Sequence, residues 1–243
     1  MTDQEYQYLK QRIFKLTGLN LEAYKDTQMR RRLEAYVNHH QPSGALDFCR
    51  SLETQPQLLH DLSNYITINV SEFYRDLPSF EYLQHAVLPN LLRGRPSLNV
   101  WSAGCSAGQE PYSLAIMLNT VVRGLPTRIL ATDIDEEALR LARAGGPYST
   151  EAVRSLSAAQ VARYFVKSGA GFMVADEVRR AVEFRRQNLL DSEFEGGFDL
   201  IVCRNVTIYF TDRVKAELNR KFFRALTEGG VLFIGGTEVM LDA

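Results

Sequence analysis

Hydrophobic positions in the first part of the chain recur three and four residues apart, the spacing of one face of a helix. Gly18 and the turn at 42–44 interrupt the pattern, as helix ends do. We therefore predict a small all-α N-terminal domain over 1–75, followed by a linker and a helix over 76–97. The apolar stripes of the four expected helices are Tyr6, Leu9, Ile13 and Leu16; Met29, Leu33, Tyr36 and Val37; Leu46, Phe48 and Leu52; and Leu58, Leu59, Leu62, Tyr65 and Ile66.

From residue 98 onward, short apolar runs alternate with helical patterns. Strands that alternate with helices form a parallel sheet covered by helices on both faces, so we predict an α/β protein with a Rossmann-like, doubly wound sheet over 98–243. The alternation lapses over about 148–182, where we expect a small inserted β-hairpin subdomain. The expected strands are 98–103, 128–132, 182–187, 198–203 and 231–234, and the expected helices are 111–122, 136–144 and 214–226.

Composition narrows the class of protein. The net charge of −1 gives no global attraction to nucleic acid or to acidic membranes, and no apolar run reaches the ~20 residues that span a bilayer. The three cysteines show no C-x-x-C spacing, and the four histidines lie within the first 85 residues, away from any cysteine ligand set. We expect a cytoplasmic monomer with reduced thiols, no metal site, no nucleic-acid partner and no membrane insertion.

The glycine turn, residues 104–108, follows the first expected strand, at the edge of the sheet where ligands bind. Gly104 and Gly108 would let a ligand approach the backbone closely, although they would equally suit a tight turn that binds nothing. The spacing differs from the G-x-G-x-x-G dinucleotide fingerprint, and no lysine follows Gly108 as a P-loop requires. The turn therefore indicates a ligand site without defining the ligand.

Two acidic residues near the glycine turn narrow the choice of ligand. Asp133 ends the second expected strand, where a carboxylate can accept hydrogen bonds from both ribose hydroxyls of a nucleoside. Glu110 stands beside the turn, where a pyrophosphate would need positive charge instead. An ammonium group and a sulfonium suit Glu110 better, which favours S-adenosylmethionine over NAD. The neighbouring Asp135 is expected to cap the helix that starts at residue 136.

Five sequence blocks, in order and spacing, resemble those of one enzyme family. They are 67–75 (TINVSEFYR), 101–113 (WSAGCSAGQEPYS), 131–135 (ATDID), 188–190 (NLL) and 198–210 (FDLIVCRNVTIYF). The chain resembles the CheR family, the chemotaxis receptor glutamate O-methyltransferases, over essentially its whole length. The resemblance implies an S-adenosylmethionine-dependent methyltransferase fold, with S-adenosylmethionine as cofactor and S-adenosylhomocysteine as product.

The resemblance also implies roles for residues at matching positions. Glu110 would hold the methionyl ammonium group, Asp133 the ribose, and Asn188 with Leu189 the adenine. The residues implied to bind the cofactor are Asn69, Ser71, Arg75, Gly104, Glu110, Asp133, Asn188, Leu189, Arg204 and Asn205.

Arg75 and Tyr209 are the residues implied to be catalytic, with Tyr209 near the methyl group. Arg75 is a permanent cation that can fork onto a carboxylate, either of the cofactor or of the substrate. Its alternative role is an interdomain salt bridge. Tyr209 lies in an apolar run and could instead be a core residue.

The protein substrate that the resemblance implies is the helical cytoplasmic domain of a chemoreceptor, with methylation sites among acidic residues. A basic cluster, Lys25, Arg30, Arg31 and Arg32, would dock this surface. Since successive helical positions turn by about 100°, the three arginines cannot all contact one partner. A solvated helix face is the alternative role of the cluster.

Three features depart from the family pattern. The stretch 167–172 lacks the longer basic, glycine-rich loop of members that tether to a receptor's C-terminal pentapeptide, so we predict pentapeptide-independent methylation. Gln109 stands where the family often has glutamate. The chain ends soon after Glu238, where the family fold normally continues into a final strand pair.

Three other functions compete with this interpretation. A methyltransferase of the same fold could act on a small molecule or RNA, although no basic, aromatic-rich stretch favours RNA. A non-catalytic module could bind the cofactor or a receptor within a signalling array. An NAD-dependent dehydrogenase is disfavoured by the missing third glycine and by Glu110.

Overall fold

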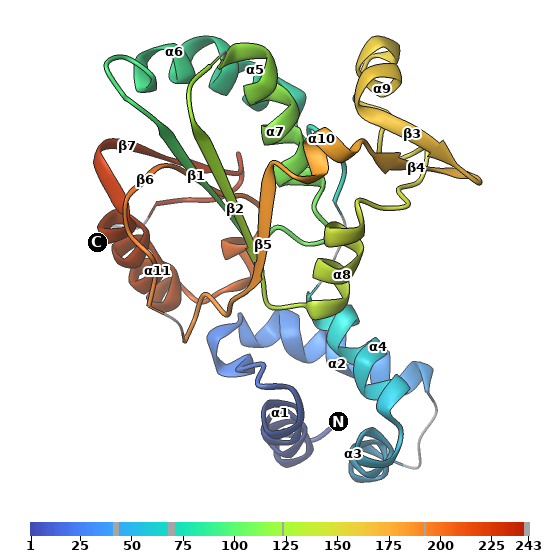
Figure 1. Ribbon diagram of the computed structural model, residues 1–243. Coiled ribbons are helices and arrows are strands. Elements are labelled where there is room, and N and C mark those ends of the chain that lie inside the picture. Colours follow the sequence, from blue (N-terminus) through green and yellow to red (C-terminus); the bar gives the residue numbers. More distant parts are fainter. Residues whose placement is uncertain (41–43, 68–70, 123, 192, 241–243) are drawn as a thin grey trace. The chain divides into compact units, whose positions relative to one another are not determined.

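The computed structural model describes residues 1–40, 44–67, 71–122, 124–191 and 193–240 (Figure 1). The chain divides into two compact units. The helical unit comprises Met1–Ile68 with Thr207–Lys215, and the sheet unit comprises Asn69–Val206 with Ala216–Ala243. Among the described residues, no helix combines the length and apolar character that crossing a membrane requires.

The helical unit confirms the all-α prediction. Thr2 caps the start of its first helix: the Thr2 hydroxyl accepts from the Glu5 amide, and the Glu5 carboxylate accepts from the Thr2 amide. Gly18 caps the end of this helix, with a φ of 77°. The predicted stripes are buried or half-buried, with Leu9, Ile13 and Leu33 fully buried, except at Leu46, which is 52% exposed and was wrongly placed on the inner face. The elements of this unit are α1 (Asp3–Thr17), η1 (Leu21–Ala23), α2 (Asp26–His39), α3 (Ala45–Thr54), α4 (Pro56–Thr67) and η3 (Thr207–Tyr209).

The segment Thr207–Lys215 joins the helical unit although it is distant in sequence. The amide of Lys25 donates to the carbonyl of Tyr209 at 2.9 Å, and the amide of Thr211 donates to that of Ala23 at 2.9 Å. The rings of Tyr24 and Phe210 pack edge to face with centroids 5.0 Å apart. The apolar pattern had placed this segment within 98–243, because pairing between distant segments leaves no periodic signal.

The sheet unit contains a five-stranded parallel sheet in the order β5-β2-β1-β6-β7 (Figure 1). The order reverses at β1, which lies between β2 on one side and β6 on the other, and ligands bind in such a crevice at the carboxyl ends of the strands. This topology confirms the predicted doubly wound fold. The strands are β1 (Leu98–Ala103), β2 (Thr127–Asp133), β5 (Val182–Arg186), β6 (Phe198–Cys203) and β7 (Leu226–Ile234).

Successive side chains of β1 pack into different clusters. Val100 joins the main core with Leu114 and Ile129, whereas the Trp101 ring packs against Phe198 and Phe222. The helices that accompany the five-stranded sheet are α5 (Leu77–Tyr82), η2 (Leu83–Val87), α6 (Leu88–Leu91), α7 (Gln109–Val121), α8 (Glu136–Ala144) and α11 (Asp212–Ala225).

The expected hairpin lies between β2 and β5 in sequence, which confirms that prediction. Its antiparallel strands are β3 (Phe165–Ser168) and β4 (Gly171–Val174), and the helices α9 (Ala158–Tyr164) and α10 (Asp176–Arg179) flank them in sequence. Tyr148 bonds the outer edge of β4, exchanging two backbone hydrogen bonds of 2.8 and 2.9 Å with Phe172. This edge of the hairpin is therefore already paired.

Candidate cofactor site

Backbone hydrogen bonds hold the glycine turn at the carboxyl end of β1. The amides of Gly104 and Cys105 donate to the Thr132 carbonyl at 2.8 and 2.9 Å, and the Tyr148 hydroxyl donates to the Ala107 carbonyl at 2.7 Å. Gly104 and Gly108 adopt left-handed conformations, with φ values of 84° and 94°. The turn is thus a fixed structure that α7 follows directly.

Gly104 is a glycine for two reasons. Its φ is one that side chains other than glycine rarely adopt. In addition, a Cβ built there would lie 2.5 Å from Cγ2 of Val206, in the segment that follows β6. The glycine turn therefore allows close contact between the segments that follow β1 and β6.

Asp133 lies at the end of β2 with its carboxylate directed at the glycine turn. One oxygen accepts from the amide of Ser106 at 2.7 Å, and the other accepts from the amide of Asp135 at 3.0 Å. Burial raises the pKa of Asp133, and these backbone amides act in the opposite direction. Asp135 caps α8 as expected, accepting from the amides of Glu137 and Ala138 at 2.9 and 3.0 Å.

Glu110 lies in the first turn of α7, and the Ser102 hydroxyl donates to its carboxylate at 2.8 Å. Burial raises the pKa of Glu110 to about 7. The charges of Arg204 and Arg75 and the Ser102 hydrogen bond oppose this rise, while the charge of Glu238 adds to it. A partly desolvated carboxylate at this position is suited to bind a cation such as an ammonium group.

Arg204, at the end of β6, is 6% exposed. Its guanidinium donates to the Arg75 carbonyl at 2.7 Å and to the Asp76 carboxylate at 3.1 Å. It also lies over the rings of Phe80 and Phe233, 5.2 and 4.9 Å from their centroids. Arg204 therefore fixes the segment that carries Arg75 against the end of β6.

The structure places the remaining predicted cofactor residues as follows. Asn188 stabilises its own turn by accepting from the Leu190 amide at 3.1 Å, and Lys221 of α11 donates to the Leu190 carbonyl at 3.1 Å. Leu189 is buried and Ser71 is half-buried. Asn69 lies outside the described residues. Asn205 follows Arg204 with a φ of 60°.

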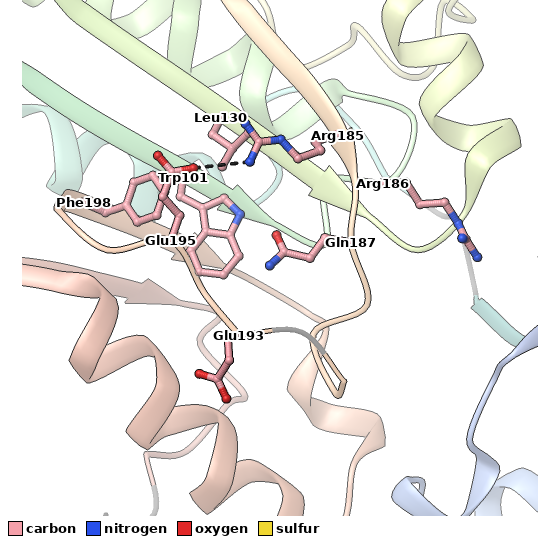
Figure 2. A pocket seen from close by; sticks show the side chains of 8 residues that line it. All are labelled: Trp101, Leu130, Arg185, Arg186, Gln187, Glu193, Glu195 and Phe198. Atoms are coloured by element: carbon pink, nitrogen blue, oxygen red, sulfur yellow. Dashed lines mark hydrogen bonds and ion pairs between the residues drawn. The ribbon is translucent and has the colours of Figure 1, made fainter.

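Figure 2 shows a separate hollow of about 220 Å³ beside the Trp101 ring. The indole nitrogen donates to the Thr132 hydroxyl at 2.9 Å, and Arg185 pairs with Glu195 at 3.3 Å. None of the predicted cofactor residues is among those that line it. Because Arg185 and Glu195 pair with each other and no predicted cofactor residue lines this hollow, we assign it no ligand.

The helical unit has a groove of its own, of about 380 Å³, which we call the basic groove. Tyr209 is partly exposed in it, so this tyrosine is not a core residue. Arg32 donates to the Tyr65 carbonyl, and its guanidinium lies 4.5 Å from the centroid of that ring. The basic groove is lined by Tyr24, Lys25, Thr27, Gln28, Met29, Arg31, Arg32, Ile66 and Tyr209.

Arg30 does not line the basic groove. Its guanidinium pairs with Asp3 at 2.6 Å and with Glu34 at 3.3 Å, and it donates to the Met1 carbonyl at 2.8 Å. The structure therefore brings three residues of the predicted basic cluster to one groove and directs the fourth elsewhere, as the helical rotation between neighbouring positions requires.

Sequence reasoning missed two residues that shape the glycine turn and its surroundings. Glu238 accepts from the amides of Asn205 and Val206, and Tyr148 bonds the turn through its hydroxyl. Both contacts join residues more than thirty positions apart, so no local pattern could have indicated them.

A doubly wound sheet, a glycine turn after its first strand and carboxylates at Glu110 and Asp133 define the class of S-adenosylmethionine-dependent methyltransferases. The comparison with protein families gives the particular family. The model described as CheR methyltransferase, SAM binding domain, matches residues 69–243, and the model of the CheR methyltransferase all-alpha domain matches residues 4–67. The chain belongs to the CheR methyltransferase family, and S-adenosylmethionine is its cofactor.

Curated relatives agree over nearly the full length. A chemotaxis protein methyltransferase of Listeria innocua is 40% identical over 99% of this chain and 92% of its own length. Chemotaxis protein methyltransferase 1 of Pseudomonas aeruginosa is 35% identical over 93% of this chain and 86% of its own. A solved structure of an S-adenosylmethionine-dependent methyltransferase from Methanococcus maripaludis covers 66% of this chain and 57% of its own, with 17% identity and a TM-score of 0.40.

Proposed function

We propose that this protein transfers the methyl group of S-adenosylmethionine to glutamate side chains in the helical cytoplasmic domain of a chemoreceptor, giving methyl esters for chemotactic adaptation. The observation that carries the choice of substrate is the basic groove, in which Lys25 and Arg31 lie with Tyr209. The names of the curated relatives support the same substrate class.

The chemistry requires no general base. A glutamate carboxylate has an unperturbed pKa of about 4.3, so it is already ionised at neutral pH. Bound S-adenosylmethionine supplies an electrophilic methyl group on a sulfonium, which a carboxylate oxygen attacks directly. The protein therefore contributes alignment and exclusion of water, and positioning of this kind can lower a barrier by roughly 7–11 kcal/mol.

Two sets of residues have distinct roles in this proposal. In the sheet unit, Glu110 holds the ammonium group and Asp133 the ribose, as their positions around the glycine turn support. Arg75 and Tyr209 keep the reacting carboxylate ionised and oriented, a need that arises because desolvation alone would raise the pKa of the target glutamate.

Recognition of the receptor rests on charge in the basic groove. Methylation sites lie among acidic residues, and an anionic helix is attracted by Lys25, Arg31 and Arg32. Arg30 contributes less in this proposal, because Asp3 and Glu34 neutralise it.

Charge reversal in the basic groove tests this docking. We expect Arg31→Glu to lower kcat/KM for receptor methylation about tenfold, since an interfacial charge pair that becomes repulsive costs on the order of 1.4 kcal/mol or more. Arg50→Glu is the matched control, because Arg50 is exposed on α3 of the same unit and does not line the groove. Equal effects of the two variants would reject the groove as the docking site.

The hairpin should not act as a tether. The outer edge of β4 is paired with Tyr148, and the turn between β3 and β4 is short. We expect removal of the last five residues of a receptor to change its methylation rate less than twofold at receptor concentrations below KM. A rate that falls tenfold or more on the truncated receptor would show that the pentapeptide is used.

A further inference from the structure

The carboxylate of Glu238 accepts hydrogen bonds from three backbone amides. Glu238 lies in the turn that follows β7, and one of its oxygens accepts from the amides of Gly235 at 2.7 Å and Asn205 at 2.8 Å. The other oxygen accepts from the amide of Val206 at 3.1 Å. Hydrogen bonds from amides to an ionised carboxylate are stronger than those between neutral groups. Glu238 thus links the segments that follow β6 and β7.

The segment that Glu238 holds is in direct contact with the glycine turn. Asn205 has a left-handed φ of 60°, a conformation that asparagine adopts more readily than most residues, and its amide is bound by Glu238. The next residue, Val206, has its side chain over Gly104, where a Cβ would lie 2.5 Å from the valine methyl. The bonds to Glu238 therefore determine where Val206 lies against the glycine turn.

Two adjacent glycines show how closely this carboxylate is fitted. A Cβ on Gly235 would lie 2.8 Å from Oε2 of Glu238, whereas a Cβ on Gly236 would meet nothing within 4 Å. Alanine at position 235 therefore displaces the carboxylate, and alanine at position 236 leaves it in place. Neither glycine has the left-handed φ that would strain an alanine.

We propose that Glu238 is a positioning residue for the cofactor: by binding the amides of Asn205 and Val206, it holds Val206 against Gly104 and so sets the shape of the glycine turn that receives S-adenosylmethionine. The proposal rests on the assignment of this turn as the cofactor site. Glu238 acts through the backbone and through Val206, so it differs in role from Glu110 and Asp133, whose side chains are assigned to the cofactor itself.

Calorimetric titration with S-adenosylhomocysteine tests the proposal. We expect Glu238→Ala and Gly235→Ala each to raise Kd about tenfold, and Glu238→Gln, which retains a carbonyl acceptor, to raise it about threefold. Gly236→Ala should bind like the unaltered protein. The titration is made at pH 8, because the charge of Glu238 raises the pKa of Glu110 and Glu110 is mainly ionised at that pH in all variants.

Amide hydrogen exchange separates positioning from a general loss of stability. In Glu238→Ala, exchange at residues 205–206 should accelerate at least tenfold, while exchange in β2 of the same sheet unit stays unchanged. In a methylation assay the variant should raise the KM for S-adenosylmethionine and change kcat less than twofold. Tight binding by both Glu238→Ala and Gly235→Ala would overturn the proposal. Absence of binding by the unaltered protein would instead reject the cofactor site on which it rests.

Discussion

Replacement of Asp133 by alanine should weaken the binding of S-adenosylhomocysteine about 100-fold. We expect the carboxylate to accept hydrogen bonds from both ribose hydroxyls in addition to its backbone amides, and bonds to an ionised acceptor contribute roughly 1.5–3 kcal/mol. The substitution also removes the acceptor of the Ser106 amide, so the glycine turn loses a hydrogen bond of 2.7 Å that restrains it. Calorimetric titration measures the change, since about 1.4 kcal/mol corresponds to each tenfold step in Kd.

Asp135→Ala is the matched control for this variant. Asp135 is an aspartate two positions away whose carboxylate caps α8, so its loss should cost about 1 kcal/mol of stability. Its effect on Kd should stay within about twofold. If Asp133→Ala binds with unchanged affinity, Asp133 does not belong to the cofactor site.

Binding of the cofactor should depend on pH through Glu110. The pKa of this carboxyl is raised to about 7, and only the ionised form attracts an ammonium group. As pH falls below 7, the ionised fraction drops and affinity should decrease about tenfold per unit. Above about pH 8 the amino group of the ligand loses its own charge, with a pKa of about 8. Affinity should therefore be greatest between these values.

Glu110→Gln should remove the acidic limb of this profile. Near pH 7.5, affinity should be about 30-fold lower than in the unaltered protein, because an ionic hydrogen bond worth roughly 2 kcal/mol is lost. Since the amide cannot ionise, the affinity of this variant should be nearly constant between pH 6 and 7.5. Titrations of both proteins across that range make the comparison. An acidic limb that persists in Glu110→Gln would assign the titration to another group.

Local sequence features predicted the parts of the site that lie close together in the chain. The glycine turn follows the first strand, Glu110 follows the turn, and Asp133 ends the next strand, so the topology of a parallel sheet brings them to one edge. The capping role of Asp135 was predicted in the same way, from its position directly before the helix that starts at Glu136. The alternation of strands and helices predicted a parallel, doubly wound sheet, whereas the order of its strands came from the structure.

Contacts between distant segments could not be predicted in this way. Thr207–Lys215 belongs to the helical unit through backbone bonds to Ala23 and Lys25, which every residue type except proline can donate. The carboxylate of Glu238 accepts from backbone amides thirty-three and thirty-two positions earlier in the chain. The orientation of the Arg30 side chain could not be predicted without knowing where its partners Asp3 and Glu34 lie. Periodicity describes which face of an element is buried, but not which partner covers it.

A single labelling assay shows whether this protein forms methyl esters on receptor glutamates. The protein is incubated with S-adenosylmethionine labelled in the methyl group and with a chemoreceptor cytoplasmic fragment, and the labelled receptor is then treated with base. A carboxyl methyl ester is hydrolysed by base, so we predict label on the receptor that base releases as methanol. Label that resists base, or no label on a panel of receptor fragments, would contradict the proposed glutamate methylation.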